Sequence, residues 1–312
     1  MNNMNNRIKH FISLNDLSIE DFGDIFELAL TLKKQQKEGV ELHPLKGRKI
    51  ALIFSKPSTR TRVSFEAGIV GLGGYPLFLG ASDIQLGRGE TISDTAKCLS
   101  RYVDGIMIRT FKQSDVEDLA KYGSIPVING LTDDMHPCQI MADLLTALEC
   151  KGKLKGLKLA YVGDGNNVAN SLLHGCAKTG IDIYVASPKG YQCAAKYVTE
   201  AVEAAKNHDS KVVMTDDPVA AVEGADIVYT DTWASMGQEA EKDARLKVFG
   251  DYQVNKELFS RAKPDAVFMH CLPAYRGFEV TEEVIDSERS VVFDEAENRM
   301  HVQNAIMVRL MA

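Results

Sequence analysis

The stretch that decides the fold runs from Lys49 to Glu66 and has the sequence KIALIFSKPSTRTRVSFE. It begins with a short apolar run bounded by basic residues, which predicts a buried strand. Beyond that run, Val63, Ala67 and Val70 recur at helical spacing, so a helix is expected there. We therefore predict a strand, a polar turn and a helix in immediate succession.

The turn between this strand and this helix has the composition of an anion site. Ser58, Thr59 and Thr61 supply hydroxyl groups. Arg60 and Arg62 supply guanidinium groups, whose donors match oxyanion oxygens in pairs. The first turn of a helix adds unpaired N–H groups and the positive end of its dipole. A simple N-cap needs only one hydroxyl, so an oxyanion site is the favoured interpretation.

Length and charge limit the classes of protein that fit. A chain of 312 residues is long enough for two domains, and its hydrophobic content of 45% and charged content of 25% are ordinary for a globular protein. Lys and Arg number 36 against 43 Asp and Glu, which gives a formal net charge of −7. That balance argues against nucleic acid as a partner, although a local basic pocket is compatible with it.

The sequence also predicts a cytoplasmic protein without a membrane partner. No apolar stretch approaches the length that crosses a bilayer, and the polar residues 1–7 lack the apolar region of a signal peptide. Cysteines without paired spacing are typical of a reducing compartment. They are Cys98, Cys138, Cys150, Cys176, Cys193 and Cys271.

Apolar runs alternate with helical patterns along the chain, beginning with a predicted helix over residues 7–40 and continuing with another over 91–102. Such alternation is typical of parallel α/β sheets. A Lys- and Gly-rich segment at 150–157 predicts a boundary, so that 1–150 and 151–297 form two open sheets. The expected strands are 49–54, 75–79, 104–109 and 125–129 before the boundary, and 158–162, 181–185, 211–214, 226–230 and 266–269 after it.

Three further residues of the first half belong with the anion turn. Arg109 ends a predicted strand, and open α/β sheets bind ligands outside the carboxyl ends of their strands. His136 and Gln139 lie one turn apart at the start of a predicted helix, so they can point at the same spot. Each of them alone is more often a solvated cap or a core residue, and only their combination favours a site.

In the second half, Gly163–Val168 has the sequence GDGNNV and follows a predicted strand. A dinucleotide site would have a third glycine where Val168 stands. The adjacent Asn166 and Asn167 place amides at a helix start, where they suit a carboxylate, although a plain Asn cap is the simpler alternative.

Two other strand ends carry reactive side chains. Asp231 follows one predicted strand, and His270 with Cys271 follows another. Adjacent His and Cys suggest a metal, but zinc needs three or four ligands and the sequence offers no companion at usable spacing. We therefore predict no metal, and a buried structural cysteine is the ordinary alternative for Cys271.

Taken in order, five motifs resemble the aspartate/ornithine carbamoyltransferase family, and its ornithine branch in particular. The resemblance covers nearly the whole chain, and the joint order of the motifs makes it specific. The motifs are Ser58-Thr59-Arg60-Thr61-Arg62, His136-Pro137-Cys138-Gln139, Asp231 followed by Ser235-Met236-Gly237, His270-Cys271-Leu272-Pro273, and Arg299.

The resemblance implies a transferase that moves the carbamoyl group of carbamoyl phosphate to the side-chain amine of L-ornithine, giving L-citrulline and phosphate. It implies no cofactor, a role in arginine biosynthesis or catabolism, and an active site in the cleft between the two domains. The domain 1–150 would bind carbamoyl phosphate, with the helix 298–312 packing back on it, and 151–297 would bind ornithine. The family also implies a homotrimer with shared sites, in which Gln85 reaches the neighbouring subunit.

Site residues carry over from the family position by position. For carbamoyl phosphate they are Ser58, Thr59, Arg60, Thr61, Gln85, Arg109, His136, Gln139, Cys271, Leu272 and Arg299. For ornithine they are Asn167, Asp231, Ser235 and Met236. The catalytic set implied is Arg109, His136, Asp231 and Cys271. Whether Cys271 or Asp231 takes the proton of the attacking amine stays open.

Three alternatives remain at this stage. A carbamoyltransferase for putrescine or an acylated ornithine would share most of these motifs. An aspartate carbamoyltransferase would share the first two motifs, but it would need a cationic pocket for a second carboxylate. A catalytically silent α/β protein that only binds ligands is the alternative from a different class.

Overall fold

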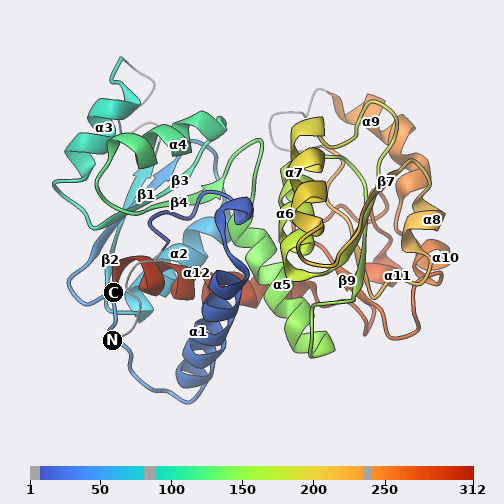
Figure 1. Ribbon diagram of the computed structural model, residues 1–312, viewed down its shortest axis with the longest axis horizontal. Coiled ribbons are helices and arrows are strands. Elements are labelled where there is room, and N and C mark those ends of the chain that lie inside the picture. Colours follow the sequence, from blue (N-terminus) through green and yellow to red (C-terminus); the bar gives the residue numbers. More distant parts are fainter. Residues whose placement is uncertain (1–7, 81–83, 85–88, 235–240) are drawn as a thin grey trace. The chain divides into compact units, whose positions relative to one another are not determined.

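The computed structural model describes residues 8–80, 84, 89–234 and 241–312 (Figure 1). The chain forms two compact units, which comprise residues 1–141 with 299–312, and residues 142–298. Both boundaries fall inside long helices, α5 (Pro137–Lys151) and α12 (Val292–Met311), so each of these helices contributes residues to both units.

The first unit is built on a parallel sheet with the strand order β2-β1-β3-β4. Its central strand, β1, is the apolar run that opens the deciding stretch, and it is buried after its first residue because it pairs on both sides. The strands are β1 (Lys49–Phe54), β2 (Tyr75–Gly80), β3 (Gly105–Arg109) and β4 (Val127–Leu131).

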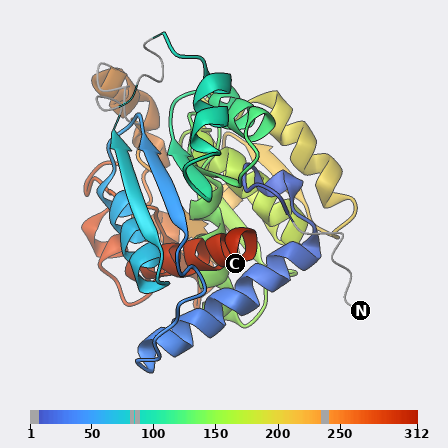
Figure 2. The same ribbon diagram turned by 90° about the vertical axis from the view of Figure 1, so that its left-hand side faces the viewer.

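Helices cover both faces of this sheet (Figures 1 and 2). Ala51, Ile53 and Ile108 point to one face, where they form a core with α3 and α4. The other face receives α2 and the end of α12, whose Met311 packs against Gly105. The helices of this unit, besides the parts of α5 and α12, are α1 (Ile19–Lys37), α2 (Thr59–Gly71), α3 (Ile92–Leu99) and α4 (Gln113–Tyr122).

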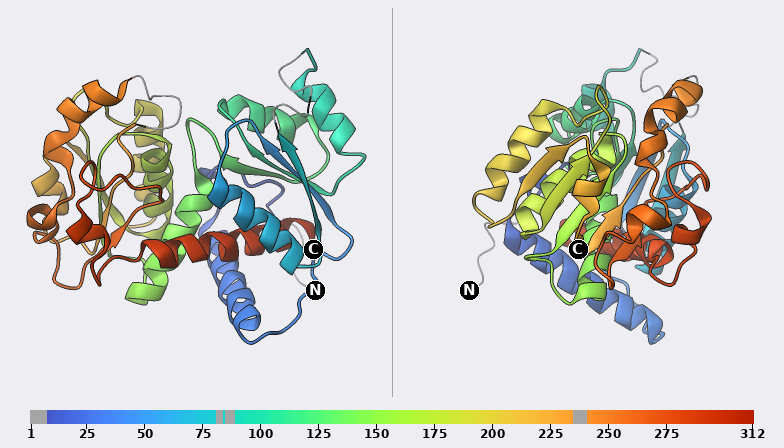
Figure 3. Two further views of the ribbon diagram at one scale, coloured as in Figure 1. Left: turned by 180° about the vertical axis from the view of Figure 1, so that it is seen from behind. Right: turned by 90° about the vertical axis from the view of Figure 1, so that its right-hand side faces the viewer.

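The second unit holds a parallel sheet with the order β7-β6-β5-β8-β9. Helices α6 and α7 cover one face, and α8 to α11 cover the other (Figure 3). The strands are β5 (Lys158–Val162), β6 (Asp182–Ala186), β7 (Val212–Thr215), β8 (Ile227–Tyr229) and β9 (Val267–Met269). The helices are α6 (Asn167–Thr179), α7 (Ala195–Ala205), α8 (Pro218–Val222), α9 (Lys242–Phe249), α10 (Lys256–Phe259) and α11 (Glu282–Ile285).

The predicted class, two open parallel α/β sheets, is confirmed, and each predicted strand overlaps an observed one. The predicted helix over residues 7–40 is wrong at its start. Ser18 caps α1, and Asp21 completes a capping box with it, so that helix begins at Ile19. Upstream, Phe11 forms a bridge with Ile128 of β4, and a short 3-10 turn, Leu14–Asp16, lies between Phe11 and the cap. Within the described part of the chain, no helix is both long and apolar enough to cross a membrane.

Candidate functional site

The deciding turn lies where ligands bind in open α/β sheets. In the first unit, β1 and β3 are neighbours, and the chain order reverses between them. The polar turn follows the carboxyl end of β1, and Arg109 is the last residue of β3. Open α/β sheets usually bind ligands outside the strand ends at such a point of reversal.

The turn is organised around the hydroxyl group of Thr61. Ser58 is the N-cap of α2, and its Oγ accepts from the backbone N–H of Thr61 at 3.2 Å and donates to Thr61 Oγ1 at 3.1 Å. The same Thr61 oxygen accepts from Arg109 Nη1 at 3.4 Å and from Arg299 Nη2 at 3.3 Å. One buried hydroxyl therefore brings together residues that are far apart in sequence.

His136 lies among these cations as a neutral ring. Burial lowers the pKa of His136 well below its ordinary value. The positive charges of Arg299, Arg109 and Arg60 lower the same pKa further. Gln139, one turn along α5, accepts a hydrogen bond from Arg299. Three guanidinium groups beside a neutral imidazole can attract an anion and still donate a hydrogen bond to an uncharged oxygen.

Not every residue of the predicted anion turn joins this cluster. Arg62 points elsewhere, because its Nε pairs with Glu66 at 3.0 Å and its guanidinium lies 3.7 Å from the centre of the Phe78 ring. The expectation that both arginines of the turn face the anion is therefore wrong for Arg62. Thr59 is the exposed first residue of α2.

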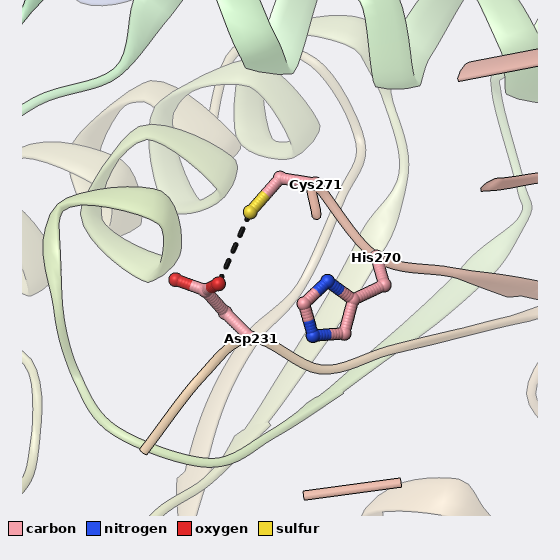
Figure 4. Close-up of side chains that lie close together, drawn as sticks. All are labelled: Asp231, His270 and Cys271. Carbon is pink, nitrogen blue, oxygen red and sulfur yellow. Dashed lines mark hydrogen bonds between the residues drawn. The ribbon is translucent and has the colours of Figure 1, made fainter. Parts of the chain in front are cut away.

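The second unit repeats this arrangement at its own point of reversal, between β5 and β8. Asn166 and Asn167 follow β5, Asp231 follows β8, and Cys271 follows β9. Cys271 Sγ donates to Asp231 Oδ1 at 3.1 Å (Figure 4). Burial, and then the negative charge of Asp231, raises the pKa of the Cys271 thiol well above its ordinary value. At neutral pH this sulfur is therefore a thiol donor.

Asn166 is a site residue that the sequence interpretation missed. Its Oδ1 caps α6 by accepting from the N–H groups of Val168 and Ala169, as the simpler alternative predicted. Its Nδ2 donates to Asp231 Oδ2 at 2.7 Å, so the carboxylate is held on both oxygens. The two adjacent asparagines were the available signal, but the prediction chose only Asn167, which is the first residue of α6.

A metal does not fit this site, although the ligand atoms of Asp231, His270 and Cys271 lie within 4.8 Å of one another. His270 Nδ1 accepts from the N–H of Leu272 at 2.9 Å, and Nε2 lies 3.3 Å from Glu279 Oε1. Both ring nitrogens are therefore engaged by the protein. Two candidate ligands remain in this group, and zinc needs three or four. The ring of His270 instead holds the backbone that follows Cys271, through the hydrogen bond from the N–H of Leu272.

Leu272 has a φ of 55°, in the left-handed region that side chains rarely adopt, so its backbone is held in a specific orientation. Gln85, Ser235 and Met236, which the prediction placed in the site, lie outside the described residues.

Comparisons with known proteins cover both units. The carbamoyl-P binding domain of aspartate/ornithine carbamoyltransferases matches residues 9–149, and the Asp/Orn binding domain of the same family matches residues 155–310.

Individual relatives agree with these matches. The ornithine carbamoyltransferase of Carboxydothermus hydrogenoformans is 59% identical over 305 residues, which covers 98% of each chain. That of Bacillus subtilis is 57% identical, covering 96% of this chain and 92% of its own. The solved structure of the Pyrococcus furiosus ornithine carbamoyltransferase superposes with a TM-score of 0.95 at 53% identity, over 97% of both chains.

Proposed function

Since the chain belongs to the aspartate/ornithine carbamoyltransferase family, we propose that it transfers the carbamoyl group of carbamoyl phosphate to the side-chain amine of L-ornithine. The products are L-citrulline and phosphate. The observation that carries this proposal is the cluster at Thr61, where guanidinium groups lie beside the neutral His136 next to the carboxyl ends of β1 and β3. Such a cluster suits a substrate with an anionic leaving group and a polarisable carbonyl.

We assign carbamoyl phosphate to the domain 1–150 with the helix 298–312, and ornithine to the domain 151–297. The charges of the two strand-end clusters support this division. The first holds Arg60, Arg109 and Arg299, which suit a phosphate. The second presents the carboxylate of Asp231, which suits an amine.

In the reaction, the amine nitrogen of ornithine attacks the carbamoyl carbon, and the C–O bond to phosphate breaks with its electrons on the phosphate. Ser58, Thr59, Arg60 and Thr61 bind the phosphate, assisted by Gln85 and Arg299. Arg109 and His136 stabilise the negative charge that develops on the carbonyl oxygen. A preorganised donor of this kind contributes about 3 kcal/mol to transition-state stabilisation.

The carbamoyl nitrogen and the attacking amine need positioning groups of their own. Gln139 and the backbone carbonyls of Cys271 and Leu272 orient the carbamoyl nitrogen. The amine has to lose a proton before it attacks. Because the Cys271 thiol already donates its hydrogen to Asp231, we favour Asp231 over Cys271 as the group that binds the amine or accepts its proton.

We place the carboxylate of ornithine at Asn167, and we assign Ser235 and Met236 to a segment that closes over the bound amino acid. Neither step calls for a cofactor. The proposed setting is the cytoplasm, in arginine biosynthesis or catabolism, as the family resemblance implies.

The test is a carbamoyl-transfer assay with purified protein and carbamoyl phosphate, in which ornithine, putrescine, N-acetylornithine and aspartate are offered side by side and the carbamoylated product of each amine is measured. We expect turnover with ornithine that exceeds the others by about 100-fold or more, because a site built to bind a substrate's polar groups rejects analogues that lack them. Faster turnover of putrescine or N-acetylornithine would identify that amine, and not ornithine, as the substrate. Binding of carbamoyl phosphate without turnover of any amine would leave only a ligand-binding protein.

We further propose a homotrimer in which Gln85 serves the site of the neighbouring subunit, as in a closed ring of identical contacts. The test mixes subunits carrying Gln85→Ala with subunits carrying Arg60→Ala, each nearly inactive alone. In shared sites, some interfaces of the mixed trimer collect neither lesion and recover activity. Mixed trimers that form by native mass and stay inactive would show that Gln85 serves its own subunit.

A further inference from the structure

One carboxylate of the second unit is buried behind the candidate ornithine site and lies outside the proposed reaction. Glu295, on α12, is 0% exposed. Its Oε1 accepts from the hydroxyl of Tyr229 at 3.3 Å, and its Oε2 accepts from the backbone N–H of His270 at 3.0 Å. A buried carboxylate is costly unless such donors compensate it, so these contacts fix its place.

The two donors belong to the strand ends that carry the candidate site. Tyr229 is the last residue of β8, two residues before Asp231. His270 follows β9 and immediately precedes Cys271. One side chain from α12 therefore connects the ends of both strands, beyond which the thiol of Cys271 meets Asp231 at 3.1 Å.

A second carboxyl group completes the arrangement. Asp143, on α5, is buried and hydrogen-bonded to Glu295. A hydrogen bond between two carboxyl groups requires a proton between them. Both oxygens of Glu295 already accept from protein donors, so the geometry makes Asp143 the donor and Glu295 the anion that accepts three hydrogen bonds.

We propose that Glu295 and Asp143 are positioning residues, which share one proton and thereby hold the ends of β8 and β9 so that Asp231 and Cys271 keep their mutual hydrogen bond. Their importance for catalysis rests on the function proposed above. The arrangement itself does not, because it concerns only the contacts among side chains of this unit.

The shared proton makes the arrangement sensitive to alkaline pH. Burial, and then Asp143, raises the pKa of Glu295 well above its ordinary value. Because the two carboxyl groups share one proton, this shift belongs to the pair, which stays singly protonated at neutral pH. The donors on both oxygens of Glu295 place that proton on Asp143. Its loss at alkaline pH leaves two buried negative charges that repel each other. The titratable groups that interact with the pair are Tyr229, Cys271, and Cys176 on α6, and Asp231 in turn acts on Tyr229 and Cys271.

Two conservative substitutions separate this role from simple packing. Glu295→Gln places an amide N–H against one of the two donors, because an amide has only one oxygen. We expect citrulline formation to fall by about tenfold or more, mainly in kcat/KM for ornithine. Asp143→Asn keeps a donor for Glu295, so we expect activity at neutral pH to stay within about threefold of the wild type. The loss of activity that we expect of the wild type at alkaline pH should be absent from this variant, because an amide has no proton to lose. Asp143→Ala removes the donor, so its rate of citrulline formation should fall as far as that of Glu295→Gln.

The matched control is Glu149→Gln, which changes a carboxylate to an amide on α5, the helix that carries Asp143. Glu149 accepts a hydrogen bond from Asn298 at 2.7 Å. It should leave the pH profile of activity unchanged.

Infrared spectroscopy gives a readout that does not depend on activity. The carbonyl band of protonated carboxyl groups at neutral pH should lose the contribution of one group in Asp143→Asn, and keep it in Glu149→Gln.

The proposal is overturned if Asp143→Asn leaves this band intact, or if folded Glu295→Gln makes citrulline at the wild-type rate. Melting temperatures for every variant separate loss of positioning from loss of fold, and Asp143→Asn, which retains the hydrogen bonds, is informative even where Glu295→Gln unfolds. A wild-type protein that makes no citrulline refutes the proposed function alone. The infrared band and the alkylation rate of Cys271, followed by mass spectrometry, then decide the carboxyl pair by themselves.

Discussion

The two strand-end clusters use the same position in the fold for opposite chemistry. In the first unit, three guanidinium groups surround a neutral imidazole. In the second, a carboxylate is held by a thiol and an amide. Both lie outside the carboxyl ends of parallel strands where the strand order reverses. The difference shows that the position of each cluster is set by topology, whereas its charge is set by a few side chains near the strand ends.

The clusters also differ in how they are supported. In the first unit the site residues hold one another, because Thr61 accepts from both Arg109 and Arg299. In the second unit the carboxylate of Asp231 relies on neighbours, among them Asn166, that themselves have structural roles. We therefore expect substitutions in the first cluster to remove activity without unfolding, and those in the second to affect both.

The largest expected effect is that of Arg60→Ala in the cationic cluster. Loss of one charged donor to the phosphate should lower citrulline formation by at least about 100-fold, with little change in melting temperature. The matched control on the same helix is Arg62→Ala, because Arg62 pairs with Glu66 on the surface. It should retain activity within about threefold, since surface ion pairs contribute little. Equal losses in both variants would contradict the assignment of Arg60.

The acidic cluster is tested by Asp231→Asn. The amide loses the negative charge that we assign to the ornithine amine, so kcat/KM for ornithine should fall by about 100-fold. Binding of carbamoyl phosphate, measured by calorimetry, should be unchanged, because its site belongs to the first cluster. Weakened binding of carbamoyl phosphate in this variant would mean that the two clusters do not divide the substrates as proposed.

Much of the contrast between the clusters was predictable, because it follows chain-local patterns. Apolar runs located the strands, so Arg109 and Asp231 were placed correctly at strand ends and Arg60 at the start of a helix. The contacts of Asn166 with Asp231 and of Glu295 with His270 were not predictable, since they join residues far apart in sequence. Neither spacing nor composition indicates that the amide oxygen of Asn166 caps a helix while its amide nitrogen donates to Asp231.

The same limit explains the errors at the start of the chain and in the anion turn. A single pattern of apolar residues extended the first predicted helix to residue 7, whereas the capping box at Ser18 decides where it begins. Arg62 has the same chemistry as Arg60, and only the nearby Phe78 ring and Glu66 turn it away. The sequence pattern does not determine which of several nearby partners a side chain will bind.

A smaller effect distinguishes the two roles of Asn166. Asn166→Ala removes the N-cap and one donor to Asp231, so it should cost about 1 kcal/mol of stability and about tenfold in kcat/KM for ornithine. Asn166→Asp keeps a capping oxygen but sets a second negative charge against Asp231. We expect it to recover stability in thermal unfolding and not activity. Recovery of both would show that Asn166 serves only as a cap.

The smallest expected effect concerns a buried histidine of the second unit, which contrasts with His136 in having a carboxylate beside it. His174 Nε2 lies 3.0 Å from Glu200 Oε2, a distance that suits an ion pair, yet burial outweighs this contact and lowers the pKa of His174 from 6.5 to about 4. The unfolded chain then binds a proton that the folded protein does not, so stability falls as the pH drops from 6.5 toward 4. Between about pH 7 and about pH 6 the loss should be about 0.7 kcal/mol in urea unfolding, because the unfolded histidine is only partly protonated there.

His174→Gln should flatten this pH dependence, and His43→Gln, which changes an exposed histidine, should leave it unchanged. The ring of His174 is fully buried, so the variant also changes packing, and the comparison therefore rests on the slope of stability against pH rather than on its absolute value. A slope of the opposite sign would mean that Glu200 stabilises a charged ring. In that case the buried ring of His174 forms an ion pair with the partly exposed Glu200, and a carboxylate outweighs the effect of burial on the pKa of His174, whereas the cations around His136 add to that effect.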